Sequence, residues 1–332
     1  IQGAKACVSA GLVAVHDMGM SLRKLRLLSR IAAAGELPPL RIFVYLNGSD
    51  ERSYAELLQE GPRASIAPRV TLMGVKLFSD GALGSRGAAL LAPYTDRPAE
   101  HGLLIMSEAE LSARVSQAHD LGAQTAVHAI GDRGVRASLH AIEGAQGGNL
   151  GRRHRIEHAQ IVHEADFRRF RELGVIASMQ PTHATSDMPW AESRVGATRI
   201  LGAYAWKRML REGVRLAFGS DAPVEDHAPL WGLWAAVTRQ DRSGLPAGGW
   251  YPHERLTTPE AIDAFTSGAA YAVMREKELG RLQPGFQLDL TVLDGDPMSK
   301  SQGWAGIQVT GTVVGGTWTS AASQAYHKAP TP

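Results

Sequence analysis

The chain has 332 residues, of which 44% are hydrophobic and 20% are charged, the balance of an ordinary folded protein. Its 35 Lys and Arg residues nearly balance 33 Asp and Glu residues, so nothing in the charge predicts a nucleic-acid partner or an anionic membrane surface. The single cysteine, Cys7, excludes an internal disulfide and a cysteine-type zinc cluster. No apolar run approaches the roughly 18 to 20 residues that a membrane-spanning helix needs, so we expect no membrane partner.

Short apolar segments alternate with helical ones from residue 11 onward. The apolar segments are rich in Val, Ile, Ala and Phe without regular polar alternation, which is typical of strands in a parallel sheet that is buried on both faces. The predicted strands are 11–19, 40–48, 71–78, 123–132, 154–162, 174–181 and 214–223. The predicted helices are 107–122, 133–145, 163–173, 199–212 and 257–274. Repetition of a strand followed by a helix predicts βα units.

Seven such units can be counted, whereas a (β/α)8 barrel needs eight. The chain opens with IQGAKACVSAG, which has no initiator Met and reads like the end of a helix, so we expect the first unit to be missing. After residue 280 two strand-like segments follow each other without a helix between them. The predicted fold is therefore an α/β protein with an N-terminally incomplete TIM-like (β/α)8 hydrolase barrel over 1–280 and a partial small β-sandwich over 281–332.

Four polar residues stand at the carboxyl ends of predicted strands, where the chemistry of a parallel barrel is located. They are Lys76, His128, His158 and Asp221. Each alone has a structural explanation: a histidine is often a hydrogen-bonded structural residue, Asp221 could cap a turn, and Lys76 could extend its stem to the barrel rim. Their matching positions on successive strands favour a hydrolytic metal site instead.

The residue types suit that chemistry. Neutral imidazoles and a carboxylate are good ligands for zinc-like ions, and a bound ion lowers the pKa of its water from 15.7 to about 7. An Asp beside that water can take its proton and return it to a leaving amine. A lysine ammonium has only donors and cannot ligate a metal. Lys76 is therefore expected to be chemically altered or to serve another purpose.

The sequence resembles the amidohydrolase superfamily, and within it the YtcJ-like branch that includes N-substituted formamide deformylase. The resemblance covers nearly the whole chain and is carried by the motifs GVKLFSDGALGSRGAALLAPYTD, AVHAIGDRGV, RHRIEHAQ, GVIASMQPTH, RLAFGSDAPVE and RLQPGFQLDLTVLDGDP. It implies a (β/α)8 barrel with one or two divalent metal ions, zinc foremost, that hydrolyses amide or related C–N bonds.

The resemblance also implies roles for the four residues. Lys76 corresponds to a lysine that carbon dioxide converts to a carbamate, which bridges two metals. His128 and His158 correspond to ligands of the second metal, and Asp221 to a first-metal ligand and proton shuttle. The family also has a His-x-His pair at the end of the first barrel strand, and this chain has no His-x-His anywhere. The residues present are mainly those of the second metal.

Further residues are candidates for substrate binding. The resemblance suggests that His183 faces the substrate. Asp80 and Arg86 follow Lys76 in a Gly-rich loop, and both are candidates for substrate contact. Arg86 could bind a substrate carboxylate through two hydrogen bonds, or it could tie this loop to the barrel. Trp190 could form a pocket wall or pack under a lid. His16, at the end of the first visible strand, could be a ligand or a packing residue.

The leading hypothesis is a metal-dependent hydrolase that cleaves an amide or other non-peptide C–N bond by attack of a metal-activated hydroxide. One alternative is a truncated, catalytically impaired barrel that acts as a binding module or remnant, and another is a mononuclear deaminase. We expect a small-molecule substrate, a cytoplasmic location, and either a homo-oligomer or a missing N-terminal segment.

Overall fold

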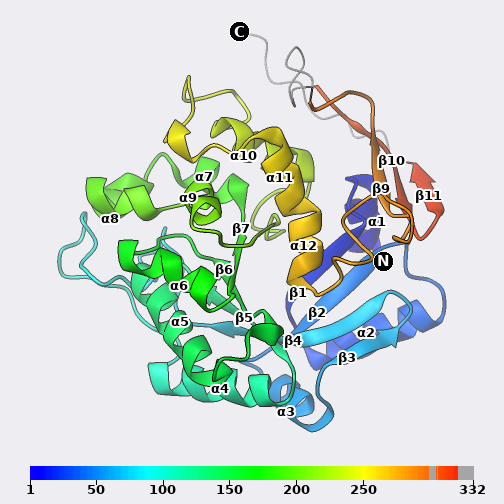
Figure 1. Ribbon diagram of the computed structural model, residues 1–332, viewed down its shortest axis with the longest axis horizontal. Helices are drawn as coiled ribbons and strands as arrows, with labels where there is room; N and C mark the ends of the chain where they lie inside the picture. The colour runs from blue at the N-terminus through cyan, green and yellow to red at the C-terminus, as the bar shows by residue number, and fades with distance from the viewer. Residues whose placement is uncertain (299–303, 305, 321–332) are drawn as a thin grey trace.

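The structure, a computed structural model, describes residues 1–298, 304 and 306–320. Its main element is a curled sheet in which parallel strands follow the order β1-β2-β4-β5-β6-β7-β8, with helices against its outer face (Figure 1). The parallel strands are β1 (Ala14–Met20), β2 (Arg41–Asn47), β4 (Val70–Phe78), β5 (Gln124–Ala129), β6 (Arg155–His158), β7 (Ile176–Met179) and β8 (Leu216–Phe218).

Helices connect successive strands and complete the βα units that the sequence predicts. They are α2 (Leu22–Ala33), α3 (Glu51–Glu60), α4 (Glu108–Asp120), α5 (Asp132–Gln146), α6 (Phe167–Glu172), α7 (Pro181–Asp187), α8 (Ala191–Arg199), α9 (Trp206–Arg211), α10 (Pro229–Thr238), α11 (Thr258–Phe265) and α12 (Ser267–Ala272). Short 3₁₀ segments are η1 (Leu150–Arg152), η2 (Glu164–Asp166), η3 (Ile200–Gly202) and η4 (Pro252–Glu254). The predicted seven-stranded, incomplete TIM-like barrel is confirmed.

The sheet is open between its two end strands. Neighbours in the sheet are hydrogen-bonded, and β1 and β8 are the two ends of the strand order within the described residues. An apolar cluster that includes Phe43 of β2 together with Ala270 and Val273 lies near the amino ends of the strands, with α12 beside them. The carboxyl ends lie at the opposite end of the half-barrel from this apolar cluster.

Some elements differ from their predicted form. β3 (Arg63–Ala67) runs antiparallel beside β4 and was not predicted, because its mixed polar sequence has no strand periodicity. The predicted helix 257–274 is divided at Thr266, whose φ of −118° and ψ of −85° are not helical. A Cβ at Gly268 would lie 2.2 Å from the carbonyl oxygen of Leu216, so glycine is required where α12 crosses β8.

A second, antiparallel sheet has the strand order β11-β10-β9. Its strands are β9 (Leu290–Leu293), β10 (Val309–Val314) and β11 (Thr317–Ser320), and α1 (Gln2–Ser9) lies against it (Figure 1). Thr312 donates a hydrogen bond of 2.6 Å to the Val8 carbonyl, and Asp289 pairs with Arg41 of β2 at 2.6 Å. This sheet corresponds to the predicted partial β-sandwich. The parts of 281–332 at 299–303, 305 and 321–332 lie outside the described residues, and the boundary at residue 280 stays a prediction.

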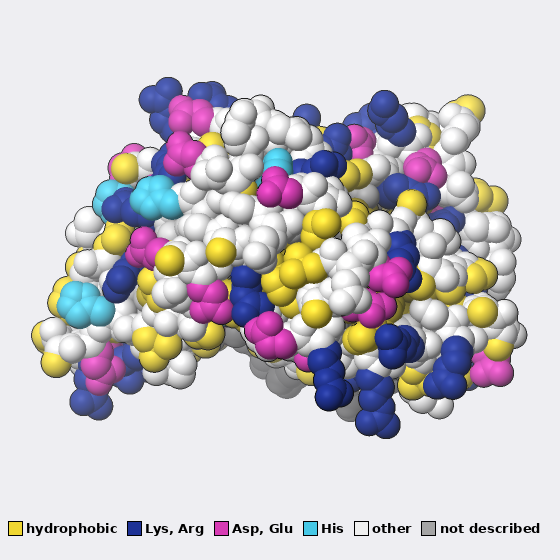
Figure 2. Space-filling model, turned by 90° about the horizontal axis from the view of Figure 1, so that it is seen from below, with side chains coloured by type: hydrophobic (Ala, Val, Ile, Leu, Met, Phe, Trp, Pro, Cys, Tyr) yellow, Lys and Arg dark blue, Asp and Glu magenta, His cyan; other side chains and the backbone are white. Residues whose placement is uncertain are grey.

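The surface and the helices agree with the composition. On the face seen in Figure 2, basic and acidic side chains lie interspersed rather than in blocks of one sign. None of the helices in the described ranges combines the length and the apolar character that a membrane crossing requires.

Candidate metal centre

The parallel register brings the predicted residues together at the carboxyl end of the sheet. In β4 and β5, Lys76 is paired with Ala126 and Phe78 with His128, and in the next pair of strands Ala129 is beside His158. The ring centroids of His128 and His158 are 4.5 Å apart. Because adjacent parallel strands end at one edge, residues that are 30 or more positions apart become neighbours.

His183 and Asp221 continue this group. The His183 ring stacks on that of His158 at a centroid distance of 5.7 Å, and its Nε2 atom lies 3.9 Å from Oδ2 of Asp221. Asp221 follows β8 with a φ of +57°, and the left-handed backbone turns its side chain toward the strand ends. We call His128, His158, His183 and Asp221, together with Lys76, the strand-end cluster.

Lys76 is the buried cation of the strand-end cluster. Only 3% of the residue is exposed, and Nζ lies 5.2 Å from the centroid of the Phe78 ring. Burial lowers the pKa of its amine from 10.5 to about 8, although the negative charges of Glu157 and Asp221 oppose that shift. An amine that loses its proton more readily than usual is a better nucleophile near neutral pH.

The two strand-end histidines are neutral and hydrogen-bonded through different ring atoms. Burial lowers the pKa of His128 to about 3 and that of His158 well below 6.5, with the charge of Lys76 lowering both further. His128 contacts the Gly81 carbonyl through Nε2 at 3.4 Å, and His158 contacts Oε1 of Gln180 through Nδ1 at 2.9 Å. Each ring therefore keeps one nitrogen lone pair that these contacts do not use.

His183 and Asp221 are less completely satisfied. Burial lowers the pKa of His183 to about 4, and within the described residues its buried Nε2 atom has no hydrogen-bond partner. Burial raises the pKa of Asp221, and the charge of Lys76 opposes that shift. A buried nitrogen without a partner is costly unless a ligand or a water satisfies it, so His183 is a candidate for contact with a ligand.

The donor chemistry of the strand-end cluster fits a divalent metal. Neutral imidazole nitrogens and a carboxylate are the ligands that zinc-like ions prefer, and Nε2 of His183 has no hydrogen-bond partner among the described residues. Among the described residues, however, no three His, Cys, Asp or Glu side chains converge closely enough to hold an ion on their own. The strand-end cluster therefore offers ligand types of the right chemistry without a preformed three-residue site in the described part of the chain.

Asp80 belongs to the loop 79–106, and its side chain is buried rather than open to a substrate. Its carboxylate is 0% exposed and accepts hydrogen bonds of 2.8 to 2.9 Å from the backbone N–H groups of Ala89, Ile130 and Gly131. Oδ1 also lies 3.7 Å from Nε2 of His128. Burial raises its pKa to about 7. In this structure Asp80 anchors the loop against β5 and touches the candidate metal ligand from behind.

Arg86 and Trp190 also support this loop. Arg86 holds Asp96 through two hydrogen bonds of 3.2 and 2.7 Å, and Arg194 contacts the same carboxylate. Trp190 precedes α8, and its ring lies 3.4 Å from the position that a Cβ on Gly84 would occupy. Of the two interpretations of Arg86, the structure shows the ion pair that ties the loop.

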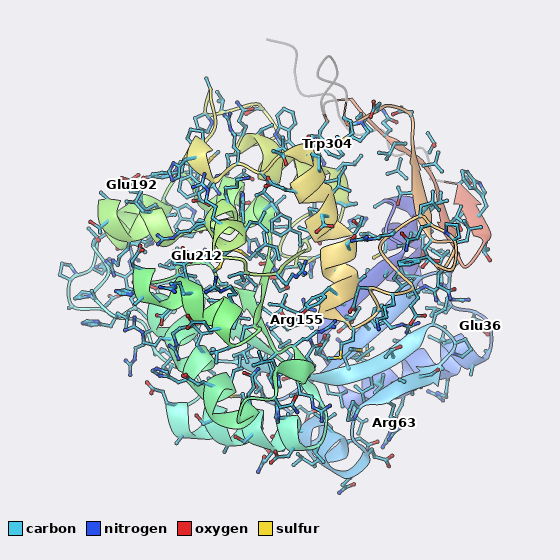
Figure 3. The ribbon with its side chains drawn as sticks, in the orientation of Figure 1. Glu36, Arg63, Arg155, Glu192, Glu212 and Trp304 are labelled. Atoms are coloured by element: carbon cyan, nitrogen blue, oxygen red, sulfur yellow. The ribbon has the colours of Figure 1, made fainter. Side chains whose placement is uncertain are left out.

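A second polar group lies deeper inside the sheet, and we call it the inner layer. Arg155, labelled near the middle of the molecule in Figure 3, donates to Glu157 at 2.5 and 3.2 Å, to Ser178 Oγ at 2.6 Å and to His16 Nδ1 at 3.0 Å. Its guanidinium carbon lies 5.5 Å from the Tyr45 ring centroid. The His16 lone pair at Nδ1 is thus occupied by Arg155, which favours packing over metal ligation for this residue.

Arg155 and Gln180 were not predicted from the sequence. Residues 155 and 157 lie two apart on one strand and so share one face, and a pair of opposite charges in a predicted buried strand was the available signal. For Gln180 the signal was weaker, because a glutamine after a strand commonly serves only to begin a turn.

The comparisons with known proteins agree with this geometry. The model of the Amidohydrolase family matches residues 2–319. The chain is 33% identical to the putative amidohydrolase YtcJ of Bacillus subtilis and 28% identical to the N-substituted formamide deformylase of Arthrobacter pascens, over 89% of this chain and 55% of each relative. The crystal structure of an uncharacterized metal-dependent hydrolase from Pyrococcus furiosus superimposes with a TM-score of 0.79 at 33% identity, over 90% of this chain and 59% of that one.

The chain thus spans about half the length of the curated relatives that it matches. The match of a family model to nearly the whole chain confirms the resemblance that the motifs indicated. The chain belongs to the amidohydrolase family.

Proposed function

We propose that this chain forms the catalytic half-barrel of a metal-dependent hydrolase that cleaves an amide or another non-peptide C–N bond. The observation that carries the proposal is the strand-end cluster, in which His128, His158, His183 and Asp221 follow one another as pairwise neighbours at the carboxyl ends of the strands, with the buried Lys76 on β4. The relatives support it, since one is named a metal-dependent hydrolase and another a formamide deformylase.

In this proposal His128, His158, Asp221 and a derivative of Lys76 hold one or two divalent ions, with zinc the first candidate. The neutral Lys76 amine adds to carbon dioxide and releases one proton, and the resulting carbamate offers two anionic oxygens in place of an ammonium that cannot ligate. A bound ion would supply a Lewis acid and a more acidic water.

In this proposal Asp221 acts first as the general base and then as the general acid. Its carboxylate accepts a proton from water as the water oxygen adds to the carbonyl carbon of the substrate, and it returns that proton to the nitrogen as the C–N bond breaks. Its nearness to His183 places both groups on one side of the strand ends. We propose His183 as a substrate contact, whereas Asp80, Arg86 and Trp190 act through the loop that they hold.

The substitution Asp221→Asn tests this function. It keeps the shape of the side chain but removes the base and one anionic ligand, so we expect weaker metal retention and, at equal metal content, a kcat/KM that is about 10²- to 10⁴-fold lower. Metal content is measured by elemental analysis after purification with zinc and bicarbonate, and turnover is measured over a panel of N-substituted amides. The matched control is Asp226→Asn, a carboxylate in the same loop that pairs with Arg242 at 2.9 Å.

The outcomes separate the candidate functions. Release of a carboxylate and an amine indicates amide hydrolysis, whereas release of ammonia indicates a deaminase. Full activity of the metal-loaded Asp221→Asn variant contradicts the proton role. A folded chain that neither retains metal nor hydrolyses any amide favours the binding module, the alternative that the open sheet between β1 and β8 suggests.

A further inference from the structure

Gln180 is a buried amide that contacts the strand-end cluster from behind. It follows β7 at the start of α7, and 7% of the residue is exposed. Its Oε1 atom lies 2.9 Å from Nδ1 of His158 on the neighbouring strand. Its Nε2 atom donates to the carbonyl oxygen of Ser178 at 3.4 Å.

These two contacts together determine which ring nitrogen of His158 carries the hydrogen. A carbonyl oxygen can only accept, so Ser178 requires the NH₂ end of the Gln180 amide. The oxygen end must then face the imidazole, and an amide oxygen also only accepts. Nδ1 of His158 is therefore the donor, and in a neutral imidazole the lone pair is left on Nε2.

The backbone at His158 adds to this control. His158 has a φ of +74° and Ala159 a φ of +42°, a left-handed conformation that non-glycine residues adopt at a cost. The chain thus turns sharply where β6 ends, and the ring is held between the His128 and His183 rings. With the backbone and the neighbouring rings restricting its direction, the hydrogen bond to Gln180 decides which nitrogen it offers.

We propose that Gln180 is a positioning residue that holds His158 in its Nδ1–H tautomer and thereby presents Nε2 as a metal ligand. The identity of the ligand rests on the proposed function, whereas the tautomer rests only on the contacts of Gln180. An amide suits this task because it cannot lose or gain a proton at working pH, so its oxygen remains an acceptor.

The test compares three variants by NMR on the chain labelled with ¹⁵N-histidine. Two-bond ¹⁵N–¹H correlations report which ring nitrogen bears the hydrogen, and His158→Gln identifies the signals. In metal-free wild type we expect the Nδ1–H form. Gln180→Met removes the acceptor at nearly constant length, and we expect a mixture of tautomers and a roughly 10- to 100-fold weaker zinc affinity.

Two further variants distinguish positioning from general stability. Gln180→Glu retains an acceptor, so we expect the wild-type tautomer and near wild-type zinc affinity. Gln146→Met is the matched control, since Gln146 is also buried and donates at 3.1 Å to the Leu173 carbonyl, outside the strand-end cluster. It should leave both the tautomer and the zinc affinity unchanged.

Contrary results are well defined. An Nε2–H form in the wild type, which needs no folded variant to observe, overturns the proposal. So does an unchanged tautomer, or an unchanged zinc affinity, in Gln180→Met. If instead the tautomer changes as expected but the wild type binds no divalent metal, the tautomer assignment holds, and both the proposed function and the role in metal presentation fail.

Discussion

The inner layer and the strand-end cluster are two groups of polar side chains on one sheet, and their buried members are satisfied in opposite ways. In the inner layer Arg155 donates to side chains from β1, β6 and β7. In the strand-end cluster His183 Nε2 has no partner among the described residues, and burial lowers the pKa of Lys76 to about 8. On β6 the two groups are adjacent, because Glu157 of the inner layer directly precedes His158 of the strand-end cluster.

The completeness of the hydrogen bonds distinguishes polar groups that stabilise the fold from polar groups that can bind a ligand. Buried polar groups whose hydrogen bonds are complete hold a structure together, because breaking one leaves an uncompensated charge. Buried polar groups with incomplete bonds and displaced pKa values are typical of sites that await a ligand. Burial alone does not separate these cases, since Arg155 and Lys76 are 2% and 3% exposed.

The largest expected effect comes from breaking the inner layer. Arg155→Met leaves the Glu157 carboxylate buried without its counter-ion, since Glu157 is 3% exposed. We expect the free energy of unfolding to fall by about 3–5 kcal/mol, measured by urea denaturation. Arg136→Met is the control, because Arg136 pairs with Asp166 on the outer face at 2.9 Å and is more exposed; it should cost much less. Equal losses of unfolding free energy in Arg155→Met and Arg136→Met would contradict the structural role assigned to the inner layer.

The strand-end cluster was predicted from the sequence more completely than the inner layer. Lys76, His128, His158 and Asp221 were found because parallel strands end at one edge, so equivalent positions in βα units must converge. The same reasoning placed seven strands in order without any contact information. Spacing along the chain is sufficient for this purpose because the βα repeat converts sequence distance into strand number.

The inner layer and the loop contacts could not be found in that way. Arg155 reaches Ser178 and His16 across the interior of the sheet, and which side chains meet there depends on the curvature of the sheet rather than on the period of the pattern. Asp80 was expected near the substrate because it follows Lys76, but three backbone N–H groups of distant segments surround it. Such partners are unknown until the loops are placed.

A smaller effect on the free energy of unfolding is expected from Lys76 of the strand-end cluster, and its size depends on pH. Burial lowers the pKa of Lys76 from 10.5 to about 8, so between those values the unfolded chain binds a proton that the folded chain has lost. Stability therefore rises with pH through this range, and it is reduced below pH 8 by about 3 kcal/mol. Lys76→Met removes this term and should be more stable than wild type at pH 7.

The comparison is made by urea denaturation from pH 7 to pH 10.5 in buffer free of metal and carbon dioxide. The stability advantage of Lys76→Met should shrink as the pH rises. Lys5→Met, at an exposed position on α1, should follow the wild type throughout. If the difference in unfolding free energy between Lys76→Met and wild type stayed constant with pH, Lys76 would not be desolvated. The contrast between the inner layer and the strand-end cluster would then lose its electrostatic basis.

The smallest effect on the free energy of unfolding is expected from Arg86, which lies in the loop 79–106. Its side chain and that of Asp96 are each 23% exposed, so the paired hydrogen bonds are partly screened by solvent, and Arg86→Ala should lower the free energy of unfolding by less than Arg155→Met or Lys76→Met changes it. Arg86→Lys keeps the charge but loses the two hydrogen bonds of the guanidinium, and it should recover little of the lost stability.

Because the guanidinium of Arg86 is occupied by Asp96, KM for amides with and without a carboxylate should change equally in both variants. A rise in KM confined to carboxylate-bearing amides would instead show that Arg86 leaves Asp96 to bind the substrate, and the loop would then belong to the binding site rather than to its support.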